Sequence, residues 1–215
     1  MVAIVGKYTR LEDSYISIRK ALHHAGNKID YKVNIKFLEA SNLESTMLSD
    51  NPASYHDAWH NLCVCDCVVV PGGFGKCGVE GKIKTCKWCR VNDKPFLGIC
   101  LGFQAAVIEF SRNVLKLDGA NSTEVYSETK HPVVIDMPEH NTSEMGGTMR
   151  LGKRTTLFKP SAVTSKIRRL YGNKDKIDER HRHRYEVNPE YIDQFEKNGN
   201  CIPLVLMLIK KEWKY

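Results

Sequence analysis

The chain has 215 residues, of which 42% are hydrophobic and 27% charged, and it carries a formal net charge of +7. That length suits one α/β domain, or slightly more, with a substantial core. Its basic residues are not interleaved with aromatic ones, and no apolar run approaches the roughly 18 residues of a membrane span. We therefore expect no nucleic-acid or membrane partner and, in the absence of a signal-peptide pattern, a cytoplasmic protein.

Strand-like and helix-like patterns alternate along the first part of the chain. An apolar strand is predicted at Val2–Val5, followed by an amphipathic helix at about Ser14–Ala25 and an alternating strand at Tyr31–Leu38. A polar, helix-like stretch then leads to the run Cys63–Val70, which is typical of a strand covered on both faces.

A helix from Val79 to about Val91 precedes a strand at Pro95–Ile99 and a further helix through Phe110. This order predicts an α/β fold with a mostly parallel central sheet flanked by helices, whose ligand site lies beyond the carboxyl ends of the strands. The second half is less regular. Its predicted elements are strands near Val133–Met137, Thr148–Leu151 and Arg182–Val187, and helices near Ser161–Tyr171 and Glu190–Asn198.

The segment Leu97–Gln104 contains a Gly-x-Cys-x-Gly motif, with Cys100 between Gly98 and Gly102. An apolar strand that enters this motif and a helix that leaves it predict a nucleophile elbow, a sharp turn that needs glycines because two backbones approach closely. The N-terminal amides of the following helix are expected to favour a thiolate at Cys100. A buried cysteine in an ordinary strand-helix unit is the alternative interpretation.

A glycine-rich segment, Pro71–Gly75, ends the neighbouring predicted strand. Thiol catalysis of amide cleavage needs an oxyanion hole, and such a loop can turn a free amide toward the developing oxyanion. The amide of Leu101, directly after the cysteine, is a second donor. A tight turn or a phosphate-binding loop is the alternative, but the phosphate-loop pattern fails because Gly81-Lys82 precedes Ile83 rather than Ser or Thr.

Several segments together resemble the glutamine amidotransferase domain of the CTP synthase family, within the triad-type (class I) glutamine amidotransferases. The resemblance extends from about residue 2 to about residue 200, and we assign residues 1–200 to this domain. The segments that carry it are Pro71–Gly75, Gly81-Lys82, Leu97–Gln104, Asn121–Glu124, Met145–Gly152 and Glu179–Asn188.

The resemblance implies a reaction. In that family a thiolate attacks the side-chain amide of L-glutamine, a glutamyl thioester forms, and ammonia passes to a separate synthetase domain that aminates UTP to CTP. It implies ATP and Mg²⁺ only in that synthetase domain, and no cofactor or metal in this one. The implied partners are the synthetase domain, on the same or another polypeptide, and further copies in a homo-oligomer of the full-length enzyme.

Carried over residue by residue, the resemblance makes Cys100 the nucleophile and the amides of Gly73 and Leu101 the oxyanion donors. A carboxylate at Glu124 suits the ammonium of glutamine, and a planar guanidinium at Arg184 suits its carboxylate. Without the resemblance, these two charges would be interpreted as a loop carboxylate and a surface charge. The implied glutamine-binding residues are Gly73, Leu101, Gly102, Phe103, Gln104, Glu124 and Arg184.

The triad histidine and glutamate of the family, which lie in a His-Pro-Glu segment near its C-terminus, are absent from this sequence. His131–Val133 lacks the glutamate, and Pro138–His140 is a reversed fragment. His181 and His183 are predicted to share one face of a strand, where we interpret them as structural imidazoles. A catalytically impaired chain that still binds glutamine is therefore an alternative to the active glutaminase.

The tail Cys201–Tyr215 departs from the family altogether. In an adjacent reading frame, codons for Ile209–Tyr215 can encode Asp-Lys-Lys-Arg-Met-Glu-Ile, close to the Glu-Arg-Met-Glu-Ile that opens the family's next strand. We therefore hypothesise a frameshift or mis-spliced gene model and expect truncated C-terminal strands. A second departure is Lys76-Cys77, where the family usually has an arginine before the following glycine.

A zinc-binding module is a further alternative, because paired cysteines at short spacings are typical of structural zinc sites. Against it, we expect Cys63, Cys65 and Cys67 to alternate along one strand and to share a face beneath a helix. Cys86 and Cys89 fit the inward stripe of a helix. The cysteines concerned are Cys63, Cys65, Cys67, Cys77, Cys86 and Cys89.

Overall fold

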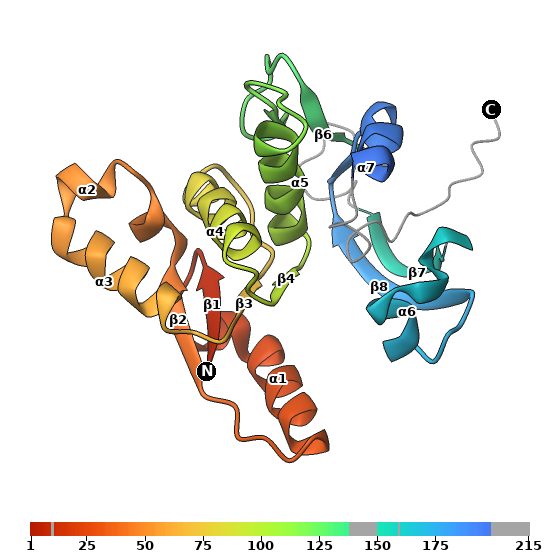
Figure 1. The fold of residues 1–215 in the computed structure, drawn as a ribbon, viewed down its shortest axis with the longest axis horizontal. Helices are drawn as coiled ribbons and strands as arrows, with labels where there is room; N and C mark the ends of the chain where they lie inside the picture. Colours follow the sequence, from red (N-terminus) through yellow and green to blue (C-terminus); the bar gives the residue numbers. More distant parts are fainter. Residues whose placement is uncertain (10, 138–149, 159, 199–215) are drawn as a thin grey trace. The chain divides into compact units, whose positions relative to one another are not determined.

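The computed structural model, drawn in Figure 1, describes residues 1–9, 11–137, 150–158 and 160–198. Its chain forms two compact units, Met1–His131 and Pro132–Tyr215. Some predictions concern segments outside the described residues, namely Pro138–His140, Met145–Met149 and Cys201–Tyr215. In the part of the chain that the structure describes, no helix has the length and apolar character needed to cross a bilayer.

The first unit is built on a four-stranded parallel sheet with the order β2-β1-β3-β4. This confirms the predicted α/β fold with a parallel central sheet flanked by helices. The elements of this unit are β1 (Val2–Gly6), η1 (Glu12–Tyr15), α1 (Ile16–Lys28), β2 (Ile35–Glu39), η2 (Ala40–Leu43), α2 (Met47–Asp50), α3 (Pro52–Cys63), β3 (Cys67–Val70), α4 (Val79–Val91), β4 (Phe96–Gly98), α5 (Leu101–Asn113) and β5 (Asn121–Ser122).

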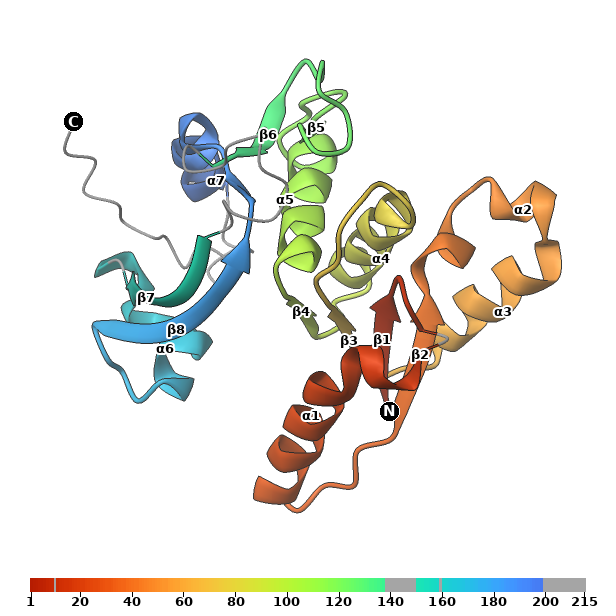
Figure 2. The same ribbon diagram turned by 180° about the vertical axis from the view of Figure 1, so that it is seen from behind.

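Both faces of this sheet are buried, which explains why β1 is apolar at every position. Ala3 and Val5 belong to a core cluster that includes Ala58 and Leu62 of α3. The alternate residues of β1 pack on the other face, in a cluster that α1 covers. Figures 1 and 2 show the sheet between these helices from two opposite sides.

The strand predicted over Cys63–Val70 is only half as long in the structure, where β3 begins at Cys67. Helix α3 continues through Cys63, which is exposed, so the three cysteines do not alternate along one strand. Cys65 packs in the cluster beneath α3, whereas Cys67 lies against the cluster on the α1 face. The prediction that the three share a face is therefore wrong, because pairing with β1 begins only at the Val2–Cys67 position.

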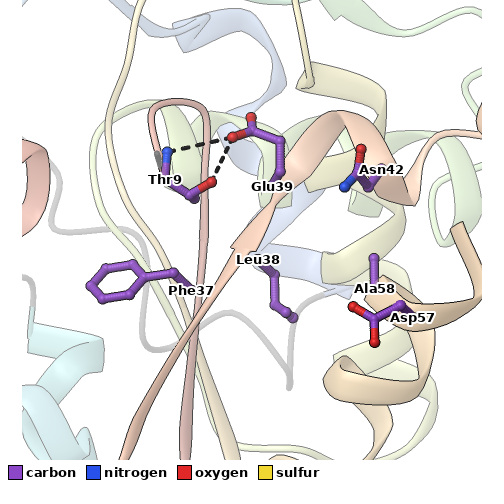
Figure 3. A pocket seen from close by; sticks show the side chains of 7 residues that line it. All are labelled: Thr9, Phe37, Leu38, Glu39, Asn42, Asp57 and Ala58. Carbon is purple, nitrogen blue, oxygen red and sulfur yellow. Dashed lines mark hydrogen bonds between the residues drawn. The ribbon is translucent and has the colours of Figure 1, made fainter. Parts of the chain in front are cut away.

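Helix α4 and the position of helix α5 agree with the sequence prediction, while β2 starts at Ile35 rather than Tyr31. Cys86 and Cys89 are buried on α4, as the inward stripe predicts. At the carboxyl end of β2 lies a small pocket that Figure 3 shows in close view, where Glu39 accepts a hydrogen bond from the Thr9 hydroxyl at 2.6 Å. The residues lining it are Thr9, Phe37, Leu38, Glu39, Asn42, Asp57 and Ala58.

The second unit contains a long antiparallel ladder of β7 with β8, in register from Arg150–His183 to Leu157–Lys176. Strands β6 and β9 also pair antiparallel. The helix predicted over Ser161–Tyr171 is divided at Ser165, whose side chain accepts from the Arg168 N–H and begins a new helix. The elements are β6 (Pro132–Asp136), β7 (Arg150–Leu157), η3 (Pro160–Thr164), α6 (Lys166–Leu170), β8 (Lys176–His183), β9 (Tyr185–Val187), η4 (Pro189–Tyr191) and α7 (Ile192–Asn198).

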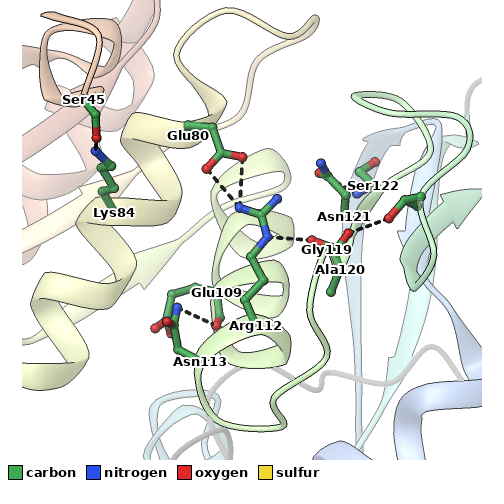
Figure 4. A network of polar contacts seen from close by, with 11 residues as sticks. Ser45, Glu80, Lys84, Glu109, Arg112, Asn113, Gly119, Ala120, Asn121 and Ser122 are labelled. Atoms are coloured by element: carbon green, nitrogen blue, oxygen red, sulfur yellow. Dashed lines mark hydrogen bonds and ion pairs between the residues drawn. The ribbon is translucent and has the colours of Figure 1, made fainter.

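Two arginine-glutamate pairs join α4 to α5. Arg90 Nη2 donates to Glu109 Oε1 at 2.7 Å, and the Glu109 side chain is only 3% exposed. Arg112 donates to both oxygens of Glu80, at 3.0 and 2.9 Å, and also to the carbonyl of Ala120, as Figure 4 shows. The Glu80 side chain is 49% exposed, so the two pairs share their chemistry and differ in burial.

We therefore expect Glu109→Ala to lower the free energy of unfolding by about 3 kcal/mol, since it empties a buried position and removes the carboxylate that pairs with Arg90. The matched Glu80→Ala should lose less than about 1 kcal/mol, because exposed pairs contribute little. Urea unfolding of both variants measures this difference. Equal losses would show that burial does not set the strength of these pairs.

Candidate active site

Cys100 occupies a strained turn between β4 and α5, with φ 53° and ψ −110°. A Cβ on Gly102 would lie 1.8 Å from the carbonyl oxygen of Val70, and one on Gly98 would lie 2.8 Å from the Gly102 backbone. Glycine is therefore required on both sides of the cysteine, as the sequence predicts. A non-glycine residue held at positive φ in such a corner is the backbone geometry of a nucleophile elbow.

The glycine-rich segment lies directly against this elbow. Strands β3 and β4 are neighbours, so the loops that leave their carboxyl ends meet. A Cβ on Gly72 would lie 3.3 Å from the Cβ of Cys100, and one on Gly73 would lie 3.8 Å from the Leu101 side chain. The structure thus brings the diglycine beside the thiol and the start of α5.

Burial raises the pKa of the Cys100 thiol. The backbone amide of Leu101 and the ammonium of Lys82 lower this pKa, whereas the carboxylate of Glu124 raises it. The Leu101 amide at the helix N-terminus thus favours the thiolate, as expected, but burial has the larger effect on this pKa. Loss of hydration disfavours the charged sulfur more than the nearby donors favour it.

Glu124 is placed next to the glycine-rich loop, where its Oε1 accepts a hydrogen bond from the Gly75 N–H at 3.0 Å. Lys7, directly after β1, reaches the same loop and donates to the carbonyl of Phe74 at 3.1 Å and to that of Gly75. Lys7 is not among the site residues predicted from the sequence. Its position just after the carboxyl end of a predicted central strand could have indicated that it lies near the site.

Lys82 on α4 is fully buried, and its Nζ donates to the carbonyl of Pro71 at 2.7 Å. Burial and, to a lesser extent, the charge of Lys7 lower the pKa of this lysine to about 7. The thiols of Cys86 and Cys100 act in the opposite direction. A buried amine beside an elbow is unusual, because burying an ammonium is costly.

Of the other predicted glutamine-binding residues, Gln104 is buried on the first turn of α5 and Phe103 is partly exposed there. Arg184 belongs to the second unit, where its carbonyl accepts from the Met137 N–H. His181 and His183 do share a face, since His181 Nδ1 lies 3.1 Å from His183 Nε2. A contact of Arg184 with glutamine remains a prediction.

The pocket at the end of β2 contains none of the elbow or glycine-loop residues. Within the described residues, no group of three or more His, Cys, Asp or Glu side chains is arranged to hold a metal ion. Lys76 and Cys77 are exposed in the loop before α4.

A family model described as "Glutamine amidotransferase class-I" matches residues 10–204. The chain belongs to this family. The chain is 56% identical over 198 residues to CTP synthase 1 of Danio rerio and 54% identical to CTP synthase 1 of Homo sapiens. Each alignment covers 92% of this chain and 33% of the relative, so the chain spans about a third of the length of these curated relatives.

A solved structure described as the glutaminase domain of Trypanosoma brucei CTPS with bound acivicin is also similar to this amidotransferase. The two share a TM-score of 0.79 and 36% sequence identity. The match covers 92% of this chain and 72% of that one. The fold and the family that the sequence motifs indicate are thus confirmed, and the likeness is to CTP synthase glutaminase domains.

The elbow glycines provide a first test of this geometry. We expect Gly102→Ala to lower the free energy of unfolding of the amidotransferase by about 3 kcal/mol or more, because its Cβ would collide with the Val70 carbonyl. Gly73→Ala should change stability much less, since its nearest neighbour, at 3.3 Å, is the flexible chain of Lys7. Thermal or urea unfolding decides, and a stable Gly102→Ala protein would contradict the close packing.

The pKa of Cys100 gives a second test. Because burial raises it, alkylation by iodoacetamide should follow a pH curve shifted to higher pH than for the same thiol in the urea-unfolded chain. The thiolate is the reacting form, so the folded protein should react more slowly near neutral pH. Site-resolved mass spectrometry separates Cys100 from the other cysteines. A folded-state curve at lower pH would mean that the helix amides outweigh burial.

Proposed function

We propose that this chain is the glutaminase half of a CTP synthase, which hydrolyses L-glutamine through a thioester on Cys100. The observation that carries the proposal is the strained Cys100 corner with the diglycine Gly72–Gly73 against it. The similarity to CTP synthases over 92% of the chain supports the same assignment.

The chemistry follows from these positions. Cys100 Sγ would attack the side-chain carboxamide carbon of glutamine, and a carbon–sulfur bond would form as the carbonyl oxygen gains negative charge. The amides of Gly73 and Leu101 would donate to this oxyanion. The carbon–nitrogen bond breaks as the nitrogen takes up the proton that the Cys100 thiol gives up, which releases ammonia and leaves a thioester. Water then cleaves the thioester to glutamate and restores the thiol.

Substrate binding is proposed to use both charged ends of glutamine. Glu124 holds the Gly75 amide with one carboxylate oxygen, so its second oxygen can accept from the ammonium of the substrate. Arg184 is the proposed partner of the substrate carboxylate. Gly102, Phe103 and Gln104, on the first turn of α5, complete the proposed binding surface.

The ammonia is proposed to serve a synthetase domain, on the same or another polypeptide, that uses ATP and Mg²⁺ to aminate UTP to CTP. The curated relatives, of which this chain spans about a third, are CTP synthases. We further propose that the full-length enzyme is a cytoplasmic homo-oligomer. This amidotransferase part itself is proposed to need no cofactor.

A second candidate function is glutamine binding with impaired turnover. The printed sequence contains no His-Pro-Glu segment, and burial raises the pKa of the nucleophile. Without a proton carrier, release of ammonia should be slow, because loss of one member of a catalytic triad costs several orders of magnitude. Such a chain would form the covalent adduct with a reactive substrate analogue but turn over glutamine poorly.

The experiment combines a diazo-ketone glutamine analogue with a glutaminase assay on the same protein. We expect the analogue to label Cys100, L-glutamine to protect it, and Cys100→Ser to abolish labelling. Ammonia release that Cys100→Ser abolishes supports the glutaminase, whereas labelling with ammonia release at least about a thousandfold below that of a complete triad enzyme favours the impaired alternative. Rapid glutamine hydrolysis would reject the impaired alternative. Absence of glutamine-protected labelling would reject the site itself.

A further inference from the structure

We propose that Lys82 and Lys7 are positioning residues that hold the two ends of the Pro71–Gly75 loop, so that the Gly73 amide stays directed at the oxyanion beside Cys100. This inference rests on the proposed glutaminase function and assigns a role to two side chains that the chemistry itself does not use.

One end of the loop is held by Lys82. Its side chain is fully buried, and its Nζ donates to the carbonyl of Pro71 at 2.7 Å, at the point where the chain leaves β3. An apolar side chain of the same length would fill this space at lower cost, because burying an amine requires desolvation. The pKa of Lys82 is lowered to about 7, mainly because burial disfavours its charged form.

The other end is held from two directions. The Lys7 ammonium donates to the carbonyls of Phe74 and Gly75, while Glu124 accepts from the Gly75 N–H. The peptide unit between Phe74 and Gly75 is therefore bonded on both its carbonyl and its amide side. Lys7 itself is fixed at its backbone, since its N–H donates to the Tyr15 hydroxyl at 2.9 Å.

Fixing the ends matters because the middle of the loop is Gly72-Gly73. Glycine populates many backbone conformations, so a peptide plane between two glycines rotates easily. In a planar trans peptide the carbonyl and the following N–H point in opposite directions, so a bonded carbonyl also fixes an amide. The peptide units Pro71–Gly72 and Phe74–Gly75 are both hydrogen-bonded. They therefore limit the rotation of the two peptide units between them, which contain Gly73.

The test compares two reagents for Cys100. The diazo-ketone glutamine analogue needs the oxyanion loop, whereas iodoacetamide needs only the thiolate. For Lys82→Met, which keeps length and volume but cannot donate, we expect the ratio of analogue rate to iodoacetamide rate to fall at least about tenfold. Lys7→Met should act in the same direction. The matched control is Lys87→Met, an exposed lysine on the same helix, which should leave the ratio unchanged.

A purely structural role makes a different prediction. It requires Lys82→Met to lower the unfolding midpoint and to slow both reagents equally, whereas we expect an unchanged or higher midpoint and a selective loss. Equal slowing, or no change in the ratio, would overturn the proposal.

Hydrogen exchange separates this inference from the proposed function. The loop amides should exchange several-fold faster in Lys82→Met than in wild type or Lys87→Met, while α4 stays protected. If the analogue fails to label even the wild type, the glutaminase proposal is rejected and loop exchange alone decides on the lysines. Unchanged loop exchange would overturn their positioning role.

Discussion

The close approach of helix α5 to strand β3 is the constraint on which the candidate site depends. Only a hydrogen at Gly102 fits against the Val70 carbonyl, so the helix axis can come within backbone contact of the sheet. That approach forces the chain between β4 and α5 into a short turn and places Cys100 at positive φ. Because β3 continues directly into Pro71 and the diglycine, the same contact places Cys100 beside Gly72.

Close packing also removes water from the site, and the charges there show its effect. Burial raises the pKa of Cys100 and lowers that of Lys82, so both groups are driven toward their neutral forms. The two groups partly offset this effect of burial. The Lys82 ammonium favours the charged form of Cys100, and the Cys100 thiolate favours the charged form of Lys82. Partial burial strengthens the interaction of backbone amides with a negative charge, because fewer water molecules screen it.

The sequence predicts this part of the molecule well where one periodicity dominates. Helix α4 and the Cys100 elbow follow from apolar spacing and from glycines whose absence of Cβ is a geometric requirement. The start of β3 does not follow from the sequence. The small apolar residues Cys63–Cys65 suit the end of a helix as well as the beginning of a strand. The β7–β8 ladder was largely missed, since its charged, mostly exposed residues show no apolar alternation. The loop contacts of Lys7 and Lys82 join segments far apart in the chain and leave no local signal.

The glycines of the Pro71–Gly75 loop meet two opposing requirements. Gly72 must lack a side chain because a Cβ there would press on Cys100, yet a diglycine has no side chain of its own to fix its peptide planes. Anchors must therefore come from outside the loop and must bind its backbone. Lysine suits that task, since its long chain reaches a carbonyl from a neighbouring element and its nitrogen only donates. Lys7 and Lys82 bind main-chain carbonyls of the loop and make it more rigid than its glycines alone would. The burial of the Lys82 amine opposes this stabilisation, because the amine loses its hydration.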